Sequence, residues 1–154
     1  MTEPHGVTDL ADTSSFDADQ LWIWTEQKAI YGGFLAGDPG RVDRRIAKEA
    51  TIWDWETERL PKNHAEFDKV RAARPKGDDV PVAIALTTDD PVITVFGDLA
   101  LCRHLVTGTY RMPDGSLDAK VIRCTLLWQK RDGDWWILHS HEDVIREYVP
   151  EVTA

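Results

Sequence analysis

The chain has 154 residues, a length that suits one domain and is sufficient to bury a hydrophobic core. Hydrophobic residues make up 42% of it and charged residues 29%, a composition typical of a globular protein and not of a disordered one. The net charge is −9, and no basic face is visible along the sequence, so we expect no nucleic-acid partner. No apolar run approaches the roughly 20 residues that span a bilayer, so we expect no membrane partner.

The start of the chain is polar and acidic. It carries Glu3, Asp9 and Asp12 but no Lys or Arg, and it lacks the basic and apolar stretches of a signal peptide. We therefore predict a flexible acidic tail over residues 1–15, a single domain over residues 16–154 and a cytoplasmic location. Cys102 and Cys124 fall within apparent strands, where we expect buried thiols and no disulfide.

The first half of the domain carries helical signals. Ser14 with Asp17, and Asn63 with Glu66, have the spacing of capping boxes ahead of apolar residues at helical intervals. Pro39, after an aspartate, is typical of the first helical position. The predicted helices are a long one that follows the Ser14 cap and ends at the glycines Gly32, Gly33 and Gly37, a short one from Pro39 through about Ala47, and a third that follows Asn63.

From residue 80 onward the sequence is rich in Val, Ile, Thr, Leu and Trp, which favour strands. The predicted strands are residues 80–88, 92–96, 99–112, 120–130 and 135–147. Asp89-Asp90-Pro91 is interpreted as a turn, and two Asp-Gly pairs suit hairpins. Helices followed by a meander of long strands predict an α+β fold, with a strongly curved antiparallel sheet and the first helix across its concave face.

Several short segments resemble one known family. The run from Arg123 to His141, with its Trp-Gln-Lys-Arg-Asp-Gly-Asp-Trp turn, resembles the C-terminal signature of the nuclear-transport-factor-2-like superfamily, in particular its SnoaL-like and calmodulin-kinase association-domain branches. Gly97-Asp98-Leu99-Ala100 and Ala36-Gly37-Asp38 are similar to further family motifs. The resemblance implies a cone-shaped fold whose helices and concave sheet face enclose an apolar pocket. It also implies that the convex face serves dimerisation, so we expect a homodimer.

The segment Ala50-Thr51-Ile52-Trp53-Asp54 resembles the ketosteroid-isomerase branch, in which the last residue is the general base. This resemblance assigns Asp54 as an acid or base of the pocket. The rest of that catalytic set does not match, because Ile30 stands where the branch has a tyrosine and Cys124 lies near the position of its proton-donating aspartate.

Three residues are candidates for proton transfer. Asp54 lies between Trp53 and Trp55, which would desolvate its carboxylate and raise its pKa, although a turn or capping role is the alternative. Glu142 would point into the cone, as a second acid or in a salt bridge. His104 shares a strand face with apolar residues, so it is either a catalyst or a satisfied core group.

His139 and His141 share one strand face, which we assign to the convex side together with Trp135 and Ile137. A structural or interface role is favoured over catalysis or metal binding there, since no third ligand has a supporting spacing. We predict no metal site and no cofactor.

Aromatic and small polar side chains are the expected lining of a site for a small hydrophobic molecule. The candidates are Trp24, Tyr31, Trp53, Trp55, Tyr110, Cys124, Trp128 and Ser140. Two hypotheses remain open. One is a cofactor-independent cyclase, isomerase or dehydratase that moves a proton beside a carbonyl; the other is a non-catalytic ligand-binding or oligomerisation module.

Overall fold

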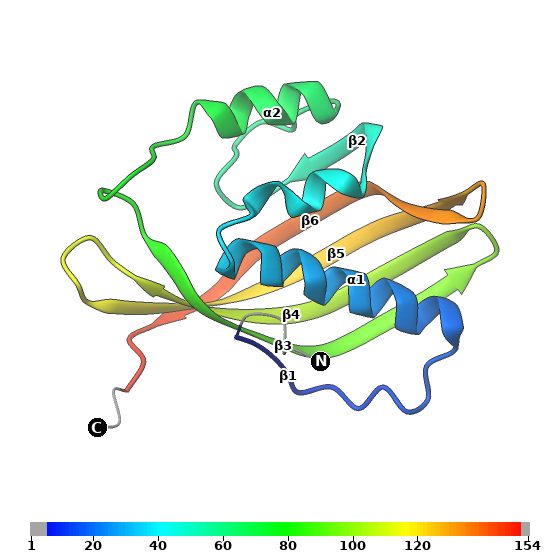
Figure 1. Cartoon of the computed structure of the whole chain (residues 1–154), viewed down its shortest axis with the longest axis horizontal. Helices are drawn as coiled ribbons and strands as arrows, with labels where there is room; N and C mark the ends of the chain where they lie inside the picture. The colour runs from blue at the N-terminus through cyan, green and yellow to red at the C-terminus, as the bar shows by residue number, and fades with distance from the viewer. Residues whose placement is uncertain (1–5, 152–154) are drawn as a thin grey trace.

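The chain folds into a six-stranded sheet with helices on one face. The computed structural model describes residues 6–151. The elements in chain order are β1 (Val7–Asp9), α1 (Ala18–Leu35), the 3-10 helix η1 (Pro39–Arg44), β2 (Ile46–Trp53), α2 (His64–Ala72), β3 (Val82–Phe96), β4 (Leu99–Arg111), β5 (Leu117–Arg131) and β6 (Asp134–Tyr148). Figure 1 shows α1 across one face of the curved sheet, with η1 and α2 in the same layer. The predicted α+β cone is confirmed.

The strand order is β1-β3-β4-β5-β6-β2. The meander from β3 to β6 is antiparallel throughout, as predicted. The two edge strands differ, because β1 pairs in parallel with β3 and β2 pairs in parallel with β6. Both edges come from the N-terminal half of the chain, which therefore contributes to the sheet as well as to the helical layer.

The start of the described chain is part of the fold. Val7 is only 4% exposed, and β1 aligns with residues 86–88 of β3. Asp9 accepts hydrogen bonds from Trp24 Nε1 at 2.8 Å and from Thr88 Oγ1 at 3.0 Å. The expected flexible tail over residues 1–15 is therefore not found at β1, because an apolar side chain and a carboxylate anchor it. The tail's residues 1–5 lie outside the described residues.

Helix boundaries differ from the expectation at two points. The N-cap of α1 is Asp17, whose side chain and Gln20 form a reciprocal capping box, so the pattern begins three residues later than Ser14 suggested. The second helix ends at Arg44 instead of near residue 47. The chain becomes a strand from Ile46, because that segment gains a hydrogen-bonded partner in β6 while burying its apolar residues.

Asp89-Asp90-Pro91 is a bulge inside one strand and not a turn between two. Asp89 pairs with Leu105 and Val92 pairs with Arg103, so two residues of β3 oppose a single residue of β4. Asp90 has a φ of 52°, a left-handed conformation that aspartate tolerates better than most residues. A proline is accommodated there because the partner β1 pairs only with residues 86–88, leaving this edge of β3 free.

A second bulge, in β6, determines which side chains of that strand point to the concave face of the sheet. Trp128 pairs with Ile137 but Leu127 pairs with His139, so Leu138 is an extra residue in β6. Trp135 and Ile137 are consequently in the core, 3% and 1% exposed, and our assignment of both to the convex face is wrong. Beyond the bulge the alternation is reversed.

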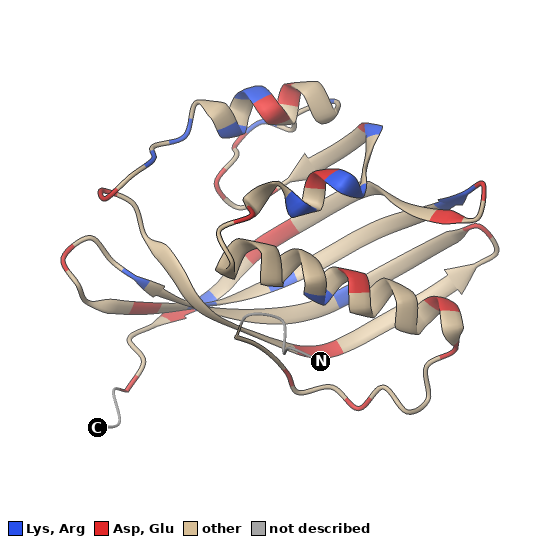
Figure 2. Cartoon of the chain, viewed as in Figure 1, with Lys and Arg blue, Asp and Glu red and all other residues tan. Residues whose placement is uncertain are grey.

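The core lies between α1 and the concave face of the sheet. Trp24 and Trp128 are fully buried, and Cys102 and Cys124 are free, buried thiols as expected. Gly33 allows η1 to approach α1, because a Cβ there would lie 2.6 Å from the Cβ of Arg41. Basic and acidic residues are interspersed along η1 and α2 (Figure 2). Within residues 6–151 no helix is both long and apolar enough to cross a membrane.

We predict that Asp9→Ala destabilises the fold by about 1–3 kcal/mol, because the Trp24 indole and the Thr88 hydroxyl lose their acceptor. Burial opposes ionisation of Asp9, yet hydrogen bonds from Ala11, Trp24 and Lys28 hold its pKa below the usual range. Its contribution is therefore present at neutral pH and is lost as the pH falls through that lowered pKa. Urea unfolding measures the effect, with exposed Asp12→Ala as the control. Equal stability of both variants would contradict the anchoring role.

Candidate functional site

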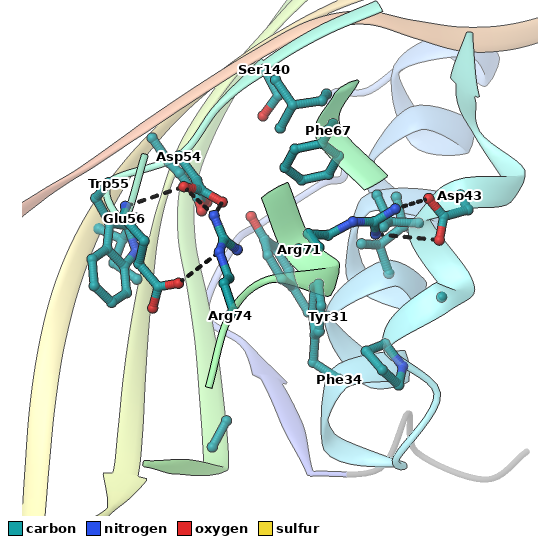
Figure 3. Close-up of a pocket in the computed structure, with 18 of the residues that line it drawn as sticks. Tyr31, Phe34, Asp43, Asp54, Trp55, Glu56, Phe67, Arg71, Arg74 and Ser140 are labelled. Carbon is teal, nitrogen blue, oxygen red and sulfur yellow. Dashed lines mark hydrogen bonds and ion pairs between the residues drawn. The ribbon is translucent and has the colours of Figure 1, made fainter. Parts of the chain in front are cut away.

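A cavity of about 920 Å³ lies between the concave face of the sheet and the helical layer. Its walls come from α1, η1, α2 and the segments after β2 and α2 on one side, and from β3 to β6 on the other. Figure 3 shows side chains from these elements converging on it. The volume falls within the range of roughly 300–1,000 Å³ that small-molecule sites occupy.

The cavity brings together most, but not all, of the candidate residues. The candidates that line it are Tyr31, Asp54, Trp55, Tyr110, Cys124, Ser140 and Glu142. Trp24, His104 and Trp128 are packed in the core behind it, and Trp53 lies on the outer side of β2, 39% exposed. Tryptophan therefore contributes less to the cavity wall than the sequence suggested, because the largest rings fill the core instead.

Asp54 lies in the cavity wall just after β2, where it is held by an arginine that the sequence did not indicate. Arg74 Nη2 lies 2.9 Å from one carboxylate oxygen of Asp54 and 2.7 Å from the other. Thr57 Oγ1 and the backbone N–H of Glu56 also donate to this carboxylate, at 2.7 and 3.1 Å. Asp54 thus combines the ion pair with the turn-capping role that was the alternative to catalysis.

The same arginine reaches a second carboxylate. Arg74 Nε lies 3.4 Å from Glu56 Oε2, and Figure 3 shows Arg74 between Asp54 and Glu56. Arg74 precedes a proline in the segment that follows α2, so only the folding of this segment over the cavity brings it to Asp54.

Glu142 lies on the row of the sheet where His104 of β4, Cys124 of β5 and Glu142 of β6 are neighbours. The reversed alternation after Leu138 turns it and Ser140 into the cavity, as predicted for these two residues. Within residues 6–151 its polar contact is Cys124 Sγ, at 3.9 Å. Burial, reinforced by the negative charges of Asp54 and Glu56, raises the pKa of Glu142 to about 7.

Tyr31 closes the bottom of the cavity and separates His104 from it. Its hydroxyl lies 2.6 Å from His104 Nε2 and 3.5 Å from Cys124 Sγ. Burial lowers the pKa of His104 to about 4, so the ring is neutral at physiological pH. The Trp24 and His104 rings also meet edge to face, with centroids 5.1 Å apart. The geometry matches the alternative of a satisfied core histidine.

The two C-terminal histidines lie on the convex side, as expected. Thr51 Oγ1 lies 2.7 Å from His139 Nδ1, and the ring of Trp53 packs against His141 with centroids 5.8 Å apart. These contacts connect β2 to β6 on the outer face.

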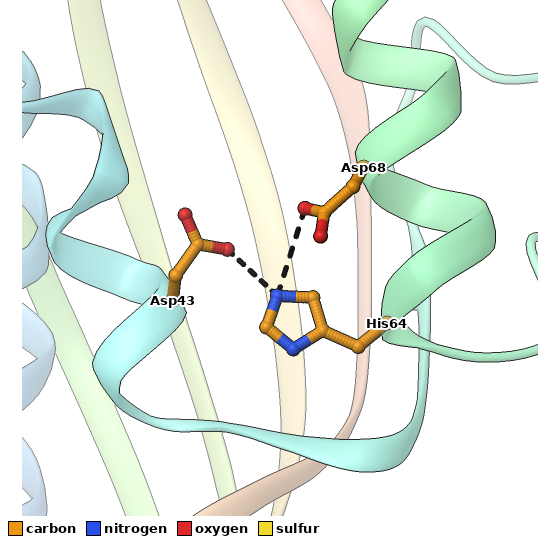
Figure 4. Close-up of side chains that lie close together, drawn as sticks. All are labelled: Asp43, His64 and Asp68. Carbon is orange, nitrogen blue, oxygen red and sulfur yellow. Dashed lines mark hydrogen bonds and ion pairs between the residues drawn. The ribbon is translucent and has the colours of Figure 1, made fainter.

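Asp43, His64 and Asp68 form another cluster of titratable groups, between η1 and α2 (Figure 4). His64 Nε2 lies 2.8 Å from Asp43 Oδ1 and 3.7 Å from Asp68 Oδ1. Arg71 pairs with both carboxylates and offsets one of their two negative charges. The cluster is accounted for as a polar contact that fastens α2 to η1.

Comparison with known proteins identifies the fold. No protein-family model matches the sequence. The sequence also has no significant match among curated proteins. Among solved structures, the "Chlamydamonas reinhardtii" CamKII hub homology domain superposes with a TM-score of 0.68 at 18% identity, covering 84% of this chain and 100% of that one.

Two further structures are similar. The S. rosetta CaMKII hub has a TM-score of 0.63 at 20% identity, covering 79% of this chain and 93% of that one. A nuclear transport factor 2 (NTF2-like) superfamily protein from Salmonella enterica has a TM-score of 0.67 at 17% identity, covering 81% and 89%. The chain therefore has the fold of NTF2-like proteins and CaMKII hub domains.

The raised pKa of Glu142 predicts a pH-dependent stability. The folded state binds this proton more tightly than the unfolded state, so the contribution is full below the ordinary carboxyl pKa of 4.5 and is lost as the pH rises through about 7. Wild type should lose about 2–3 kcal/mol more than Glu142→Gln between pH 4 and pH 8. Urea unfolding at both pH values measures this, with exposed Glu58→Gln as the control. A slope unchanged by Glu142→Gln would contradict burial of the acid.

Proposed function

We propose that this chain is a non-catalytic association module that forms homo-oligomers through the convex face of its sheet. One observation carries the proposal: an apolar strip on the face opposite the helices. The strip consists of Val92, Phe96, Leu99, Leu101, Leu105 and Leu127.

The strip spans three strands, and Thr94 and Arg103 lie on the same face among its apolar residues. Phe96 is opposite Leu99, and Leu101 is opposite Leu127, so the side chains of each pair lie on the same face. Phe96 is 63% exposed, and Val92 is 48% exposed. Exposed apolar side chains gathered on one face are typical of protein–protein contacts, and the helices of the chain already cover the other face.

Association domains are among the similar structures. One is the association domain of C. elegans CaMKII, with a TM-score of 0.64 at 17% identity. A fold of this kind hosts many functions, so the strip and not the likeness is the principal support.

We expect the wild-type protein to be a dimer or larger homo-oligomer at micromolar concentration. Leu127→Asp places a charge in the middle of the strip and should shift the protein toward the monomer; Phe96→Asp does so at the exposed end, with less risk to folding. Light scattering coupled to size-exclusion chromatography measures the mass, with Leu21→Asp on the exposed side of α1 as the control. A wild-type monomer would refute the proposal.

A second candidate is proton transfer on a hydrophobic carbonyl compound, as in a cyclase, isomerase or dehydratase. It is favoured by Asp54 and Glu142 lining the same cavity, where a base and an acid could reach one substrate. The contacts of Asp54 weigh against it, because Arg74 engages both carboxylate oxygens.

Asp54→Asn separates the two candidates. If the ion pair is structural, the variant should lose about 1–2 kcal/mol of stability, between the values of surface and buried pairs, and should still bind a fluorescent hydrophobic probe. If Asp54 is a base, stability should change little, while turnover of a substrate should fall by about 10²-fold or more. Thermal melts and probe titrations decide, with exposed Asp78→Asn as the control for removing a charge.

A further inference from the structure

One half-buried acid in the cavity, Glu142, has no ion pair with a basic side chain within residues 6–151. Glu142 is partly exposed where it lines the cavity, and protein atoms desolvate the rest of its side chain. Its one polar contact within residues 6–151 is the Cys124 thiol, 3.9 Å away, which is a weak hydrogen-bond donor. A desolvated carboxylate with so little protein support is costly to ionise unless a ligand supplies the missing charge.

The charges around Glu142 do not balance. Asp54, Glu56 and Glu142 line this part of the cavity with Arg74, which pairs with the first two, so three acids face one base and leave −2 when all are ionised. Lys120 is nearby but is engaged by Asp118 and Glu147.

The rest of the cavity also has charged groups, and these are paired or exposed. Arg71 and Asp43 pair with each other on the helical side. Lys76 lies in the exposed segment after α2. The local deficit of positive charge therefore stays at Glu142.

The surrounding surface suits the body of an organic cation. Aromatic rings contribute prominently to the wall: Tyr31, Phe34, Trp55, Phe67 and Tyr110. Faces of such rings attract cations, and Lys120 Nζ already lies 5.6 Å from the ring of Tyr110 and 6.0 Å from that of Trp55. Ser140, on the same face of β6 as Glu142, adds a hydroxyl that can accept a hydrogen bond from an ammonium group.

We propose that the cavity binds an organic amine in its ammonium form, with the cationic group against the Glu142 carboxylate and the apolar body along the aromatic wall. The inference concerns the cavity and does not depend on oligomerisation through the convex strip. It differs from a site for a neutral carbonyl compound, for which a protonated Glu142 would act as the hydrogen-bond donor.

Affinities for the two ligand classes should depend on pH in opposite ways, because an ammonium group needs ionised Glu142 and a carbonyl group needs protonated Glu142. The groups around Glu142 decide whether another group titrates in the same range. The titratable and charged groups that face it or lie beside it are Tyr31, Asp54, Glu56, Arg74, His104, Tyr110, Lys120, Cys124, His141 and Asp143. Burial keeps the pKa of His104 at about 4 and raises that of Tyr110 to about 12. Burial also raises the pKa values of Tyr31 and Cys124 well above their usual ranges. Burial raises the pKa of Glu142 to about 7, so its charge is expected to change between pH 6 and pH 8.

The test uses 2-phenylethylamine, with 2-phenylethanol as the neutral control and phenylacetate as the anionic control, titrated into the full chain by calorimetry. At pH 8 the amine should bind at least about tenfold more tightly than either control. At pH 6 its affinity should be about tenfold lower, because a carboxyl with a pKa near 7 is then mostly protonated. Affinity for the alcohol should not fall between pH 6 and pH 8 in this way.

Glu142→Gln should lower the affinity for the amine by about tenfold or more at pH 8 and abolish its pH dependence, while leaving the affinity for the alcohol unchanged; Glu58→Gln should change neither. Wild-type pH dependence tests the proposal independently if Glu142→Gln fails to fold. The proposal is overturned if the alcohol or phenylacetate binds as tightly as the amine at pH 8, if amine affinity rises toward pH 6, or if the amine does not bind at millimolar concentration.

Discussion

The inserted residue in β6 is the constraint on which the site depends. Before Leu138, Ile137 packs in the core; after it, Ser140 and Glu142 face the cavity and His139 faces outward. In a regular strand, Ile137 and His139 would share one face, so either a core residue or a cavity residue would point the wrong way. The bulge also bends the strand, which contributes to the curvature that makes one face of the sheet concave.

Curvature gives the two faces of the sheet different surroundings. The concave face is covered by α1 and the layer beyond it, and incomplete filling leaves a cavity of about 920 Å³. The convex face has no helix of this chain over it within residues 6–151, and it carries an apolar strip centred on Leu101 and Leu127. The proposed ligand site and the proposed association surface therefore lie on opposite faces, where separate substitutions can test them.

Much of the fold was predictable because its signals are local. Each capping box, Asp-Gly turn and β-prone run involves only a few neighbouring positions in the sequence. The family resemblance indicated how the resulting elements are arranged. The Asp89-Asp90-Pro91 bulge and the insertion at Leu138 were missed because turn residues and strict alternation look the same whether a strand ends or bends. Arg74 was missed for another reason: its pairing with Asp54 joins segments 20 residues apart, and no periodicity connects them.

In our proposal, Glu142 is a desolvated acid whose carboxylate pairs with a cationic ligand. Carbon-13 NMR titration of the Glu142 side-chain carboxyl, without and with saturating 2-phenylethylamine, measures this directly. A pKa near 7 in the free protein, falling by about one unit or more when the amine is bound, is the predicted result. A pKa in the ordinary glutamate range, or one that the amine leaves unchanged, would contradict the account.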